Sequence, residues 1–203
     1  MRWLHHPNII NYMDAFRYEN ELWVVTEGIS DMMTLQKVVA TNAGMSMAKR
    51  EAFIATVLPH VSQALDYLHR HGISHRGINM ENILFSKMGH VRLKLCAMIP
   101  DPHTSQSRRS SPPEVRAGQP YDFKSDIWNL GALIIEVLDT ENKIEMQQSE
   151  ALVLAFRFHL RPSAAIAESV GRMLHKDPGK RPSAAELLKF CPSLTQRART
   201  CMY

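Results

Sequence analysis

The sequence has few of the residues that mark secreted, metal-binding or membrane-spanning proteins. It has three cysteines in 203 residues, Cys96, Cys191 and Cys201, and their spacing fits neither a disulfide framework nor paired zinc ligands. The longest apolar run, residues 130–138, contains Glu136 and is too short to span a bilayer. The start of the sequence shows no signal-peptide pattern. These absences predict an intracellular protein, most simply a cytoplasmic one.

A strong excess of charge of one sign is also missing. The chain has 24 Lys and Arg against 20 Asp and Glu, a formal net charge of +4 that is spread along the sequence. Such a modest charge excludes a nucleic acid or a membrane surface as the expected partner. The length, with 45% hydrophobic residues, indicates one globular domain with a single core.

The ten histidines raise the alternative of a metal site. His69, His71 and His75 lie close together in the sequence, but no cysteine pair or second histidine pair stands at a ligand spacing from them. Cations at the C-terminus of a helix interact favourably with its dipole. The cluster is therefore interpreted as a helix end, and no metal site is predicted.

Hydrophobic periodicity predicts more helix than strand. Strands are expected over residues 9–16, 21–27, 82–86 and 91–95. Helices are expected over residues 34–40, 46–71, 126–138, 149–159 and 163–174. A last helix should begin at Ser183, because Ser183 and Glu186 have the spacing of a capping box. Pro59 should kink the long helix or leave a backbone partner unmatched, and the proline-rich residues 99–121 are expected to be a loop.

Six motifs then follow one another in a characteristic order: HPNIINYMDAF, NELWVVTE, YLHRHGISHRGINMENILF, SPPE, KSDIWNLG and DPGKRPSAAELL. In this order they resemble the large lobe of a protein kinase, over nearly the whole chain. The segments ELWVV and TLQKVV are most similar to the PAK-type Ser/Thr kinases that small GTPases activate. The resemblance implies an α+β, protein-kinase-like fold, with a mostly helical C-lobe and only the last strands and hinge of the N-lobe.

The resemblance also implies where the parts of the chain begin and end. Residues 1–29 would be a remnant of the N-lobe and hinge, residues 30–192 the C-lobe, and residues 193–203 a tail without fixed structure. The glycine-rich loop of the family, its N-lobe Lys and the Glu partner of that Lys would all lie upstream of His6. On this reading a bound nucleotide would contact the hinge and the C-lobe, but no glycine-rich loop of this chain would cover it.

The residues that support the lobe in the family are present. They are His75, Arg76, Glu114, Asp126, Trp128, Gly131 and Arg181. The resemblance implies that the Asp126 carboxylate accepts hydrogen bonds from the backbone amides around His75 and Arg76. It also implies an ion pair between Glu114 and Arg181, which would tie the segment before the central helix to the last helices.

The residues that perform the chemistry of the family are replaced. Gly77 stands in the position of the catalytic Asp, and general-base help is worth roughly 100- to 10,000-fold in rate. Asn79 stands where Ser/Thr kinases carry a Lys. Asn82 matches the metal-binding Asn, but one neutral amide does not hold magnesium without carboxylate ligands, and Asn82 is expected to hydrogen-bond the loop instead.

The magnesium-binding Asp-Phe-Gly triplet is missing in either of two alignments. One places Leu95, Cys96 and Ala97 in its position, and the other deletes the triplet; neither leaves a carboxylate there. Thr26, Glu27 and Leu84 would be what remains of the nucleotide pocket. Although the family uses ATP and Mg²⁺, no cofactor and no bound metal are therefore expected.

The predicted function is a degenerate kinase-like domain that lacks phosphotransfer and acts, if at all, as a binding or scaffolding module for a protein partner that the sequence does not name. One alternative is a Ser/Thr protein kinase whose N-lobe lies outside this chain. That alternative would restore the glycine-rich loop and the Lys, but neither the base at Gly77 nor the metal-binding Asp. The other alternative is a truncated product with no independent role.

Overall fold

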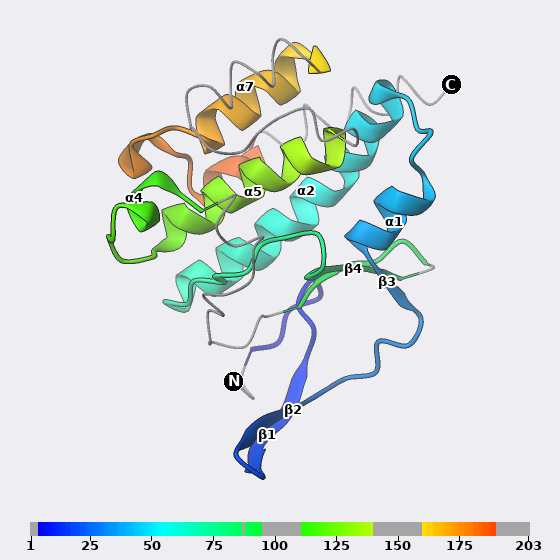
Figure 1. Ribbon diagram of the computed structural model, residues 1–203, viewed down its shortest axis with the longest axis vertical. Coiled ribbons are helices and arrows are strands. Elements are labelled where there is room, and N and C mark those ends of the chain that lie inside the picture. Colours follow the sequence, from blue (N-terminus) through cyan, green and yellow to red (C-terminus); the bar gives the residue numbers. More distant parts are fainter. Residues whose placement is uncertain (1–3, 87, 95–110, 140–159, 190–203) are drawn as a thin grey trace.

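The computed structural model describes residues 4–86, 88–94, 111–139 and 160–189, without the side chain of Leu22. Three helices, α2 (Met47–Arg70), α5 (Phe123–Leu138) and α7 (Ala164–Met173), lie together above two small sheets (Figure 1). Helix α5 contacts both α2 and α7. None of the helices in these described ranges is both long and apolar enough to cross a membrane.

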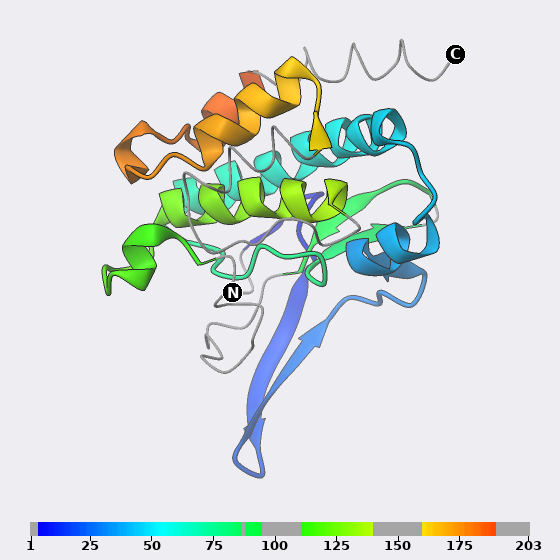
Figure 2. The same cartoon turned by 45° about the horizontal axis from the view of Figure 1, so that its top comes forward.

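The first sheet is a hairpin of β1 (Tyr12–Tyr18) and β2 (Glu21–Thr26) that projects away from the helices (Figures 1 and 2). Its turn residues Glu19 and Asn20 have φ values of 47° and 66°, as a two-residue hairpin turn requires. The side chains of Phe16 and Trp23 lie opposite each other and stack at 6.4 Å, although each is about half exposed.

The second sheet contains β3 (Met32–Thr34), β4 (Ile83–Ser86) and β5 (Val91–Leu93), antiparallel and in that order. Strand β3 was not predicted, because three residues are too few to show an alternating pattern. It leads directly into α1 (Leu35–Thr41), whose first turn is capped by the Thr34 hydroxyl, which accepts from the Lys37 amide at 3.2 Å.

Helix α5 is the centre of the core, and all but four of its sixteen residues are buried. The sequence predicted its start at Asp126, but it begins three residues earlier, at Phe123. The reason is a capping box: the Asp122 carboxylate accepts from the Ser125 amide at 3.0 Å, while the Ser125 hydroxyl accepts from the Asp122 amide. Asp126 therefore lies in the first turn of the helix, with its side chain turned inward.

The remaining helices largely follow the sequence prediction. Helix α2 continues past Pro59 as one element of 24 residues. Residues 184–189 are helical, and the predicted capping box is present, since the Ser183 amide donates to Glu186 at 2.7 Å and the Glu186 amide donates to Ser183 at 3.2 Å. The predicted helix over residues 149–159 and the tail at 193–203 lie outside the described residues. The boundaries drawn at residues 29 and 192 stay predictions.

Two local predictions were wrong. β1 begins at Tyr12 rather than at residue 9, because Ile9 and Ile10 pair with Leu93 of β5 and so belong to the other sheet. The expected loop over residues 99–121 contains a short helix, α4 (Pro113–Arg116), in its described part. A proline near the N-terminus of a helix is favourable, because its missing amide would have had no partner there.

Candidate functional site

The turn between α2 and β4, residues 74–82, is where the resemblance places the catalytic loop. Helix α2 ends at Arg70, and Gly72 follows with a φ of 73°, which a glycine adopts without strain. The Ile73 amide then donates to the Leu68 carbonyl at 3.0 Å. This closed helix end fixes the direction in which the chain enters the turn.

Gly77 is held in this turn by hydrogen bonds from both sides. Its amide donates to Nδ1 of His75 at 3.1 Å, and its carbonyl accepts from Nδ2 of Asn82 at 2.8 Å. The Asn79 side chain accepts from the amides of Glu81 and Asn82, both at 3.0 Å. The expected hydrogen bond of Asn82 to the loop is thereby confirmed. The loop is ordered around a position that carries no carboxylate.

His75 is buried and neutral beneath this turn, with an exposed fraction of 3%. Its Nε2 donates to the carbonyl of Lys94 at 3.0 Å, while Nδ1 accepts from Gly77. Burial lowers the pKa of His75, although the nearby Asp126 carboxylate acts in the opposite direction. His75 therefore connects the turn to Lys94, the residue that directly follows β5.

Asp126 is the main anchor of the turn. Its carboxylate is fully buried and accepts from the amide of His75 at 2.8 Å and from the amide of Arg76 at 2.9 Å. The φ of Arg76 is 64°, a strained value for a residue with a side chain, which this pair of bonds holds in place. The two hydrogen bonds expected from the resemblance are present.

Two further donors to Asp126 were not anticipated. Nε2 of His69 lies 2.9 Å from Oδ2, and the Tyr121 hydroxyl donates to Oδ1 at 2.6 Å. Burial alone would raise the pKa of Asp126, but the hydrogen bond from His69 and the other donors hold it below the usual range. Burial and the Asp126 charge raise the pKa of Tyr121 well above its ordinary value. The carboxylate is thus a buried charge with four hydrogen-bond partners.

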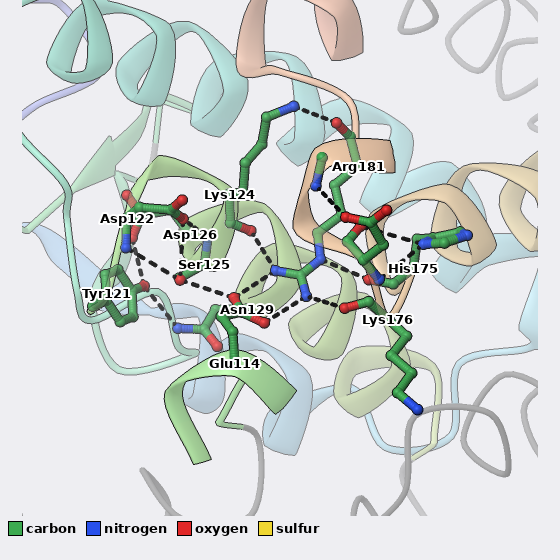
Figure 3. A network of polar contacts seen from close by, with 12 residues as sticks. Glu114, Tyr121, Asp122, Lys124, Ser125, Asp126, Asn129, His175, Lys176 and Arg181 are labelled. Atoms are coloured by element: carbon green, nitrogen blue, oxygen red, sulfur yellow. Dashed lines mark hydrogen bonds and ion pairs between the residues drawn. The ribbon is translucent and has the colours of Figure 1, made fainter. Parts of the chain in front are cut away.

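A second buried charge, Arg181, lies beside the start of α5 (Figure 3). The guanidinium of Arg181 binds both carboxylate oxygens of Glu114, with Nη1–Oε1 and Nη2–Oε2 distances of 2.7 Å each. Its remaining N–H groups donate to the backbone carbonyls of His175, Lys124 and Lys176. The ion pair expected between Glu114 and Arg181 is present, and it joins α4, α5 and the segment around η2 (Pro178–Lys180).

Residues of α5 complete this second centre. The ring of Trp128 lies 4.9 Å from the guanidinium carbon of Arg181, at a cation–π distance. The Ser125 hydroxyl donates to Glu114 at 3.0 Å. Gly131 allows α7 to approach, because a Cβ there would come within 2.9 Å of Cβ of Met173. Trp128 and Ser125 of α5 thus contact the ion pair, while Gly131 makes room for α7.

Thr26, Glu27 and Leu84, the residues expected to remain from a nucleotide pocket, have partners in both sheets. The Thr26 hydroxyl donates to the Glu27 carbonyl at 3.1 Å, and the Glu27 carboxylate accepts from the Asn11 amide and forms an ion pair with Arg92. Leu84 is buried in β4, opposite Thr34 and Arg92. Burial opposes ionisation of Glu27, but Asn11 and Arg92 lower its pKa.

Some predicted positions lie outside the described residues. They include Leu95, Cys96 and Ala97, where the metal-binding triplet was sought. In the part of the chain that the structure describes, no group of three His, Cys, Asp or Glu side chains is arranged to hold a metal ion. In the printed sequence itself, no Asp or Glu occurs between Glu81 and Asp101.

Comparison with known families agrees with this arrangement. The sequence pattern of the family described as "Protein kinase domain" matches residues 1–190. This match covers both buried anchors and the whole turn between α2 and β4.

Similar proteins include several Ser/Thr kinases of the PAK group. The "Serine/threonine-protein kinase shk1/pak1" of Schizosaccharomyces pombe is 33% identical over 95% of this chain and 30% of its own length. The "Serine/threonine-protein kinase PAK mbt" of Drosophila melanogaster is 33% identical over 93% of this chain and 31% of its own length. The "Serine/threonine-protein kinase PAK 5" of Rattus norvegicus is 30% identical over 93% of this chain and 28% of its own length. The chain thus spans about a third of the length of these relatives, and the predicted similarity to PAK-type kinases is confirmed.

Proposed function

This chain belongs to the protein kinase domain family, and from that premise we propose that it is a degenerate member, which does not transfer phosphate and acts as a binding module. One observation carries the proposal: position 77 is a glycine within a turn whose backbone is held by hydrogen bonds to Asp126, His75, Asn79 and Asn82. The turn would present a catalytic Asp in the right place, yet it has no side chain to accept the proton of a substrate hydroxyl.

The residues available for ATP and Mg²⁺ do not fit these cofactors. Magnesium in this family is held by carboxylate and phosphate oxygens together with the Asn that matches Asn82. Gly77 supplies no carboxylate, and the next acidic residue after Glu81 in the sequence is Asp101.

The binding half of the proposal is supported by what the domain retains. The anchors at Asp126 and Arg181 are buried, charged and fully hydrogen-bonded, and such groups hold a rigid shape whether or not chemistry follows. A rigid domain that does not transfer phosphate still has a surface of fixed shape to which a protein partner can bind. Binding to a protein partner should accordingly need neither ATP nor magnesium.

A Ser/Thr kinase is the second candidate function, favoured by the printed names of the relatives and by the intact geometry of Asn82 and Asp126. An active enzyme would need a general base other than position 77 and a metal ligand other than residues 95–97. The two candidates differ in whether magnesium-ATP stabilises the protein.

A thermal-shift titration separates them, using the longest form of the protein that cells produce. We expect magnesium-ATP to bind no tighter than about 1 mM, roughly 4 kcal/mol, so that about 0.1 mM leaves the melting temperature unchanged. The kinase domain of shk1/pak1, prepared in the same way, is the positive control. A magnesium-dependent rise in melting temperature at that concentration would favour the enzyme.

A further inference from the structure

The segment that carries the hairpin, residues 4–11, is fastened to the rest of the protein at a few points. The Asn8 carbonyl accepts from the Leu93 amide at 2.8 Å, and the Ile10 amide donates to the Leu93 carbonyl at 3.1 Å. The His5 amide donates to the Tyr67 hydroxyl of α2 at 3.2 Å. These contacts join the base of the hairpin to β5 and α2.

Asn8 is the centre of this attachment, and two imidazoles serve as its acceptors. Its buried side-chain Nδ2 lies 2.9 Å from the Val91 carbonyl and 3.1 Å from Nδ1 of His60. Its backbone amide donates to Nδ1 of His6 at 3.1 Å. All the N–H groups of Asn8 are therefore used, and two of the three bonds end on a histidine nitrogen.

The geometry fixes the protonation of both imidazoles. Nδ2 of Asn8 has two hydrogens, one for the Val91 carbonyl and one for His60. Turning the amide over would place its oxygen against the Val91 carbonyl, so His60 has to accept. A backbone amide only donates, so His6 has to accept as well. A proton on Nδ1 of either ring would replace an acceptor with a donor facing another donor.

The groups around the two rings make protonation harder still. Burial lowers the pKa of His6, whose ring lies 5.0 Å from that of Tyr67. The ring of His71 lies 4.3 Å from the same Tyr67 ring. Burial, and then the facing His90 of the β4–β5 turn, lower the pKa of His60.

The acidic side chains near these elements have partners of their own. On α2, Asp66 forms an ion pair with Arg70 at 3.0 Å. Glu27, next to Asn11, is paired with Arg92. Among the described residues, the groups placed against the two rings are the N–H groups of Asn8, the Tyr67 phenol beside His6, and His90, whose charge acts on His60.

We propose that His6, His60 and Asn8 form a histidine latch, which holds the hairpin-bearing segment on α2 and β5 while both imidazoles are neutral and releases it on acidification. The direction follows from proton linkage. A released histidine regains its ordinary pKa of about 6.5, so the released state binds more protons and gains as the pH falls below that value. The latch is independent of the proposed loss of phosphotransfer.

Hydrogen exchange followed by mass spectrometry or NMR tests the latch in the whole chain, at about pH 7.5 and about pH 5.5, with rates corrected for intrinsic exchange. Each proton taken up on release lowers protection by up to about tenfold per pH unit. We therefore expect the amides of Asn8, Ile10 and Leu93 to lose about tenfold or more in protection relative to those of α5. Equal protection at the two pH values would overturn the proposal.

Asparagine variants supply the matched comparison. His6→Asn and His60→Asn each place an uncharged amide oxygen near the position of Nδ1, so the double variant should keep its protection at the lower pH. His71→Asn is the control: Nδ1 of His71 lies 2.7 Å from the Tyr67 carbonyl, a bond that a protonated ring also donates, so this variant should behave like wild type. A pH-dependent loss that persists in the double variant would contradict the latch.

One measurement needs no variant. Long-range ¹H–¹⁵N spectra of the wild-type protein report which ring nitrogen carries the proton. At about pH 7.5 both His6 and His60 should be protonated on Nε2 alone, and their titration should coincide with the loss of exchange protection. A proton on Nδ1 of either ring at that pH, or a titration at a different pH from the loss of protection, would rule the latch out.

Discussion

The two polar centres at α5, one around Asp126 and one around the Glu114–Arg181 pair, contrast with position 77 in the turn between α2 and β4. Asp126 and Arg181 are buried and Glu114 is partly buried, and all three are hydrogen-bonded, with distances of 2.6–2.9 Å to Asp126 and 2.7 Å within the Glu114–Arg181 pair. At position 77 the same turn has only backbone groups. A buried charge cannot lose its partners without a large cost, whereas a solvent-facing catalytic carboxylate can be lost with little effect on folding. Stability and chemistry are therefore separable in this domain.

Among the variants that test this comparison, Asp126→Ala should cause the largest loss in the free energy of unfolding. The variant leaves the amides of His75 and Arg76, and the side chains of His69 and Tyr121, without their common acceptor. We expect a loss of about 3–5 kcal/mol in the free energy of unfolding, measured by urea denaturation.

Asn129→Ala is the matched control on the same helix. Asn129 donates a hydrogen bond to the Tyr121 hydroxyl at 3.0 Å, and its buried Oδ1 has no partner among the residues that the structure describes. The cost should be below about 1 kcal/mol, since one bond is lost and one unpaired acceptor is removed. Equal denaturation midpoints for the two variants would show that Asp126 is not the anchor described.

The second-largest loss in the free energy of unfolding is expected from Arg181→Lys. A lysine keeps the charge but cannot bind both Glu114 oxygens and the carbonyls of His175 and Lys124 at once. We expect a loss of about 2–4 kcal/mol, because polar groups are left unpaired in a buried site. A double-mutant cycle with Glu114→Gln should give a coupling energy above about 1 kcal/mol, and a coupling near zero would mean that the pair does not act as a unit.

The smallest change in the free energy of unfolding is expected from Ser62→Ala, and it should be a gain rather than a loss. Ser62 is fully buried in α2, and within the described part of the chain its hydroxyl has no hydrogen-bond partner. Ser62→Ala removes an unsatisfied polar group, so the variant should be equally stable or more stable by up to about 1 kcal/mol. A clear destabilisation in the same urea assay would indicate a partner for the hydroxyl that the contacts do not reveal.

The capping box at Ser183 was predictable from the spacing of Ser183 and Glu186 alone. The anchor at Asp126 and the pairing of Glu114 with Arg181 were predictable because the six motifs resemble those of protein kinases, and that resemblance implied both. The early start of α5 also has a signal in the sequence, Asp122 three residues before Ser125, although the apolar run itself begins later.

Other features had no local signal. His69 reaches Asp126 from 57 residues away, and Asn8 reaches His60 from 52 residues away. Such contacts depend on how α2 packs against α5 and β5, which periodicity does not specify. The three-residue strand β3 is defined by its pairing with β4 rather than by its own composition.

The most direct test of the central claim is a phosphotransfer assay on Gly77→Asp in the longest natural form of the protein. The variant restores the missing carboxylate in a turn that is already ordered, and the φ of Gly77 is not positive, so a side chain brings no backbone strain of that kind. Wild type, Gly77→Asp, and Gly77→Asp with Leu95→Asp would be compared using radiolabelled ATP, magnesium and a basic Ser peptide. Because the catalytic groups of this family act as a unit, restoring one should return little of the whole. We predict no transfer above background from wild type or from the single variant. Transfer by either one would contradict the account and show that the rest of the site is intact.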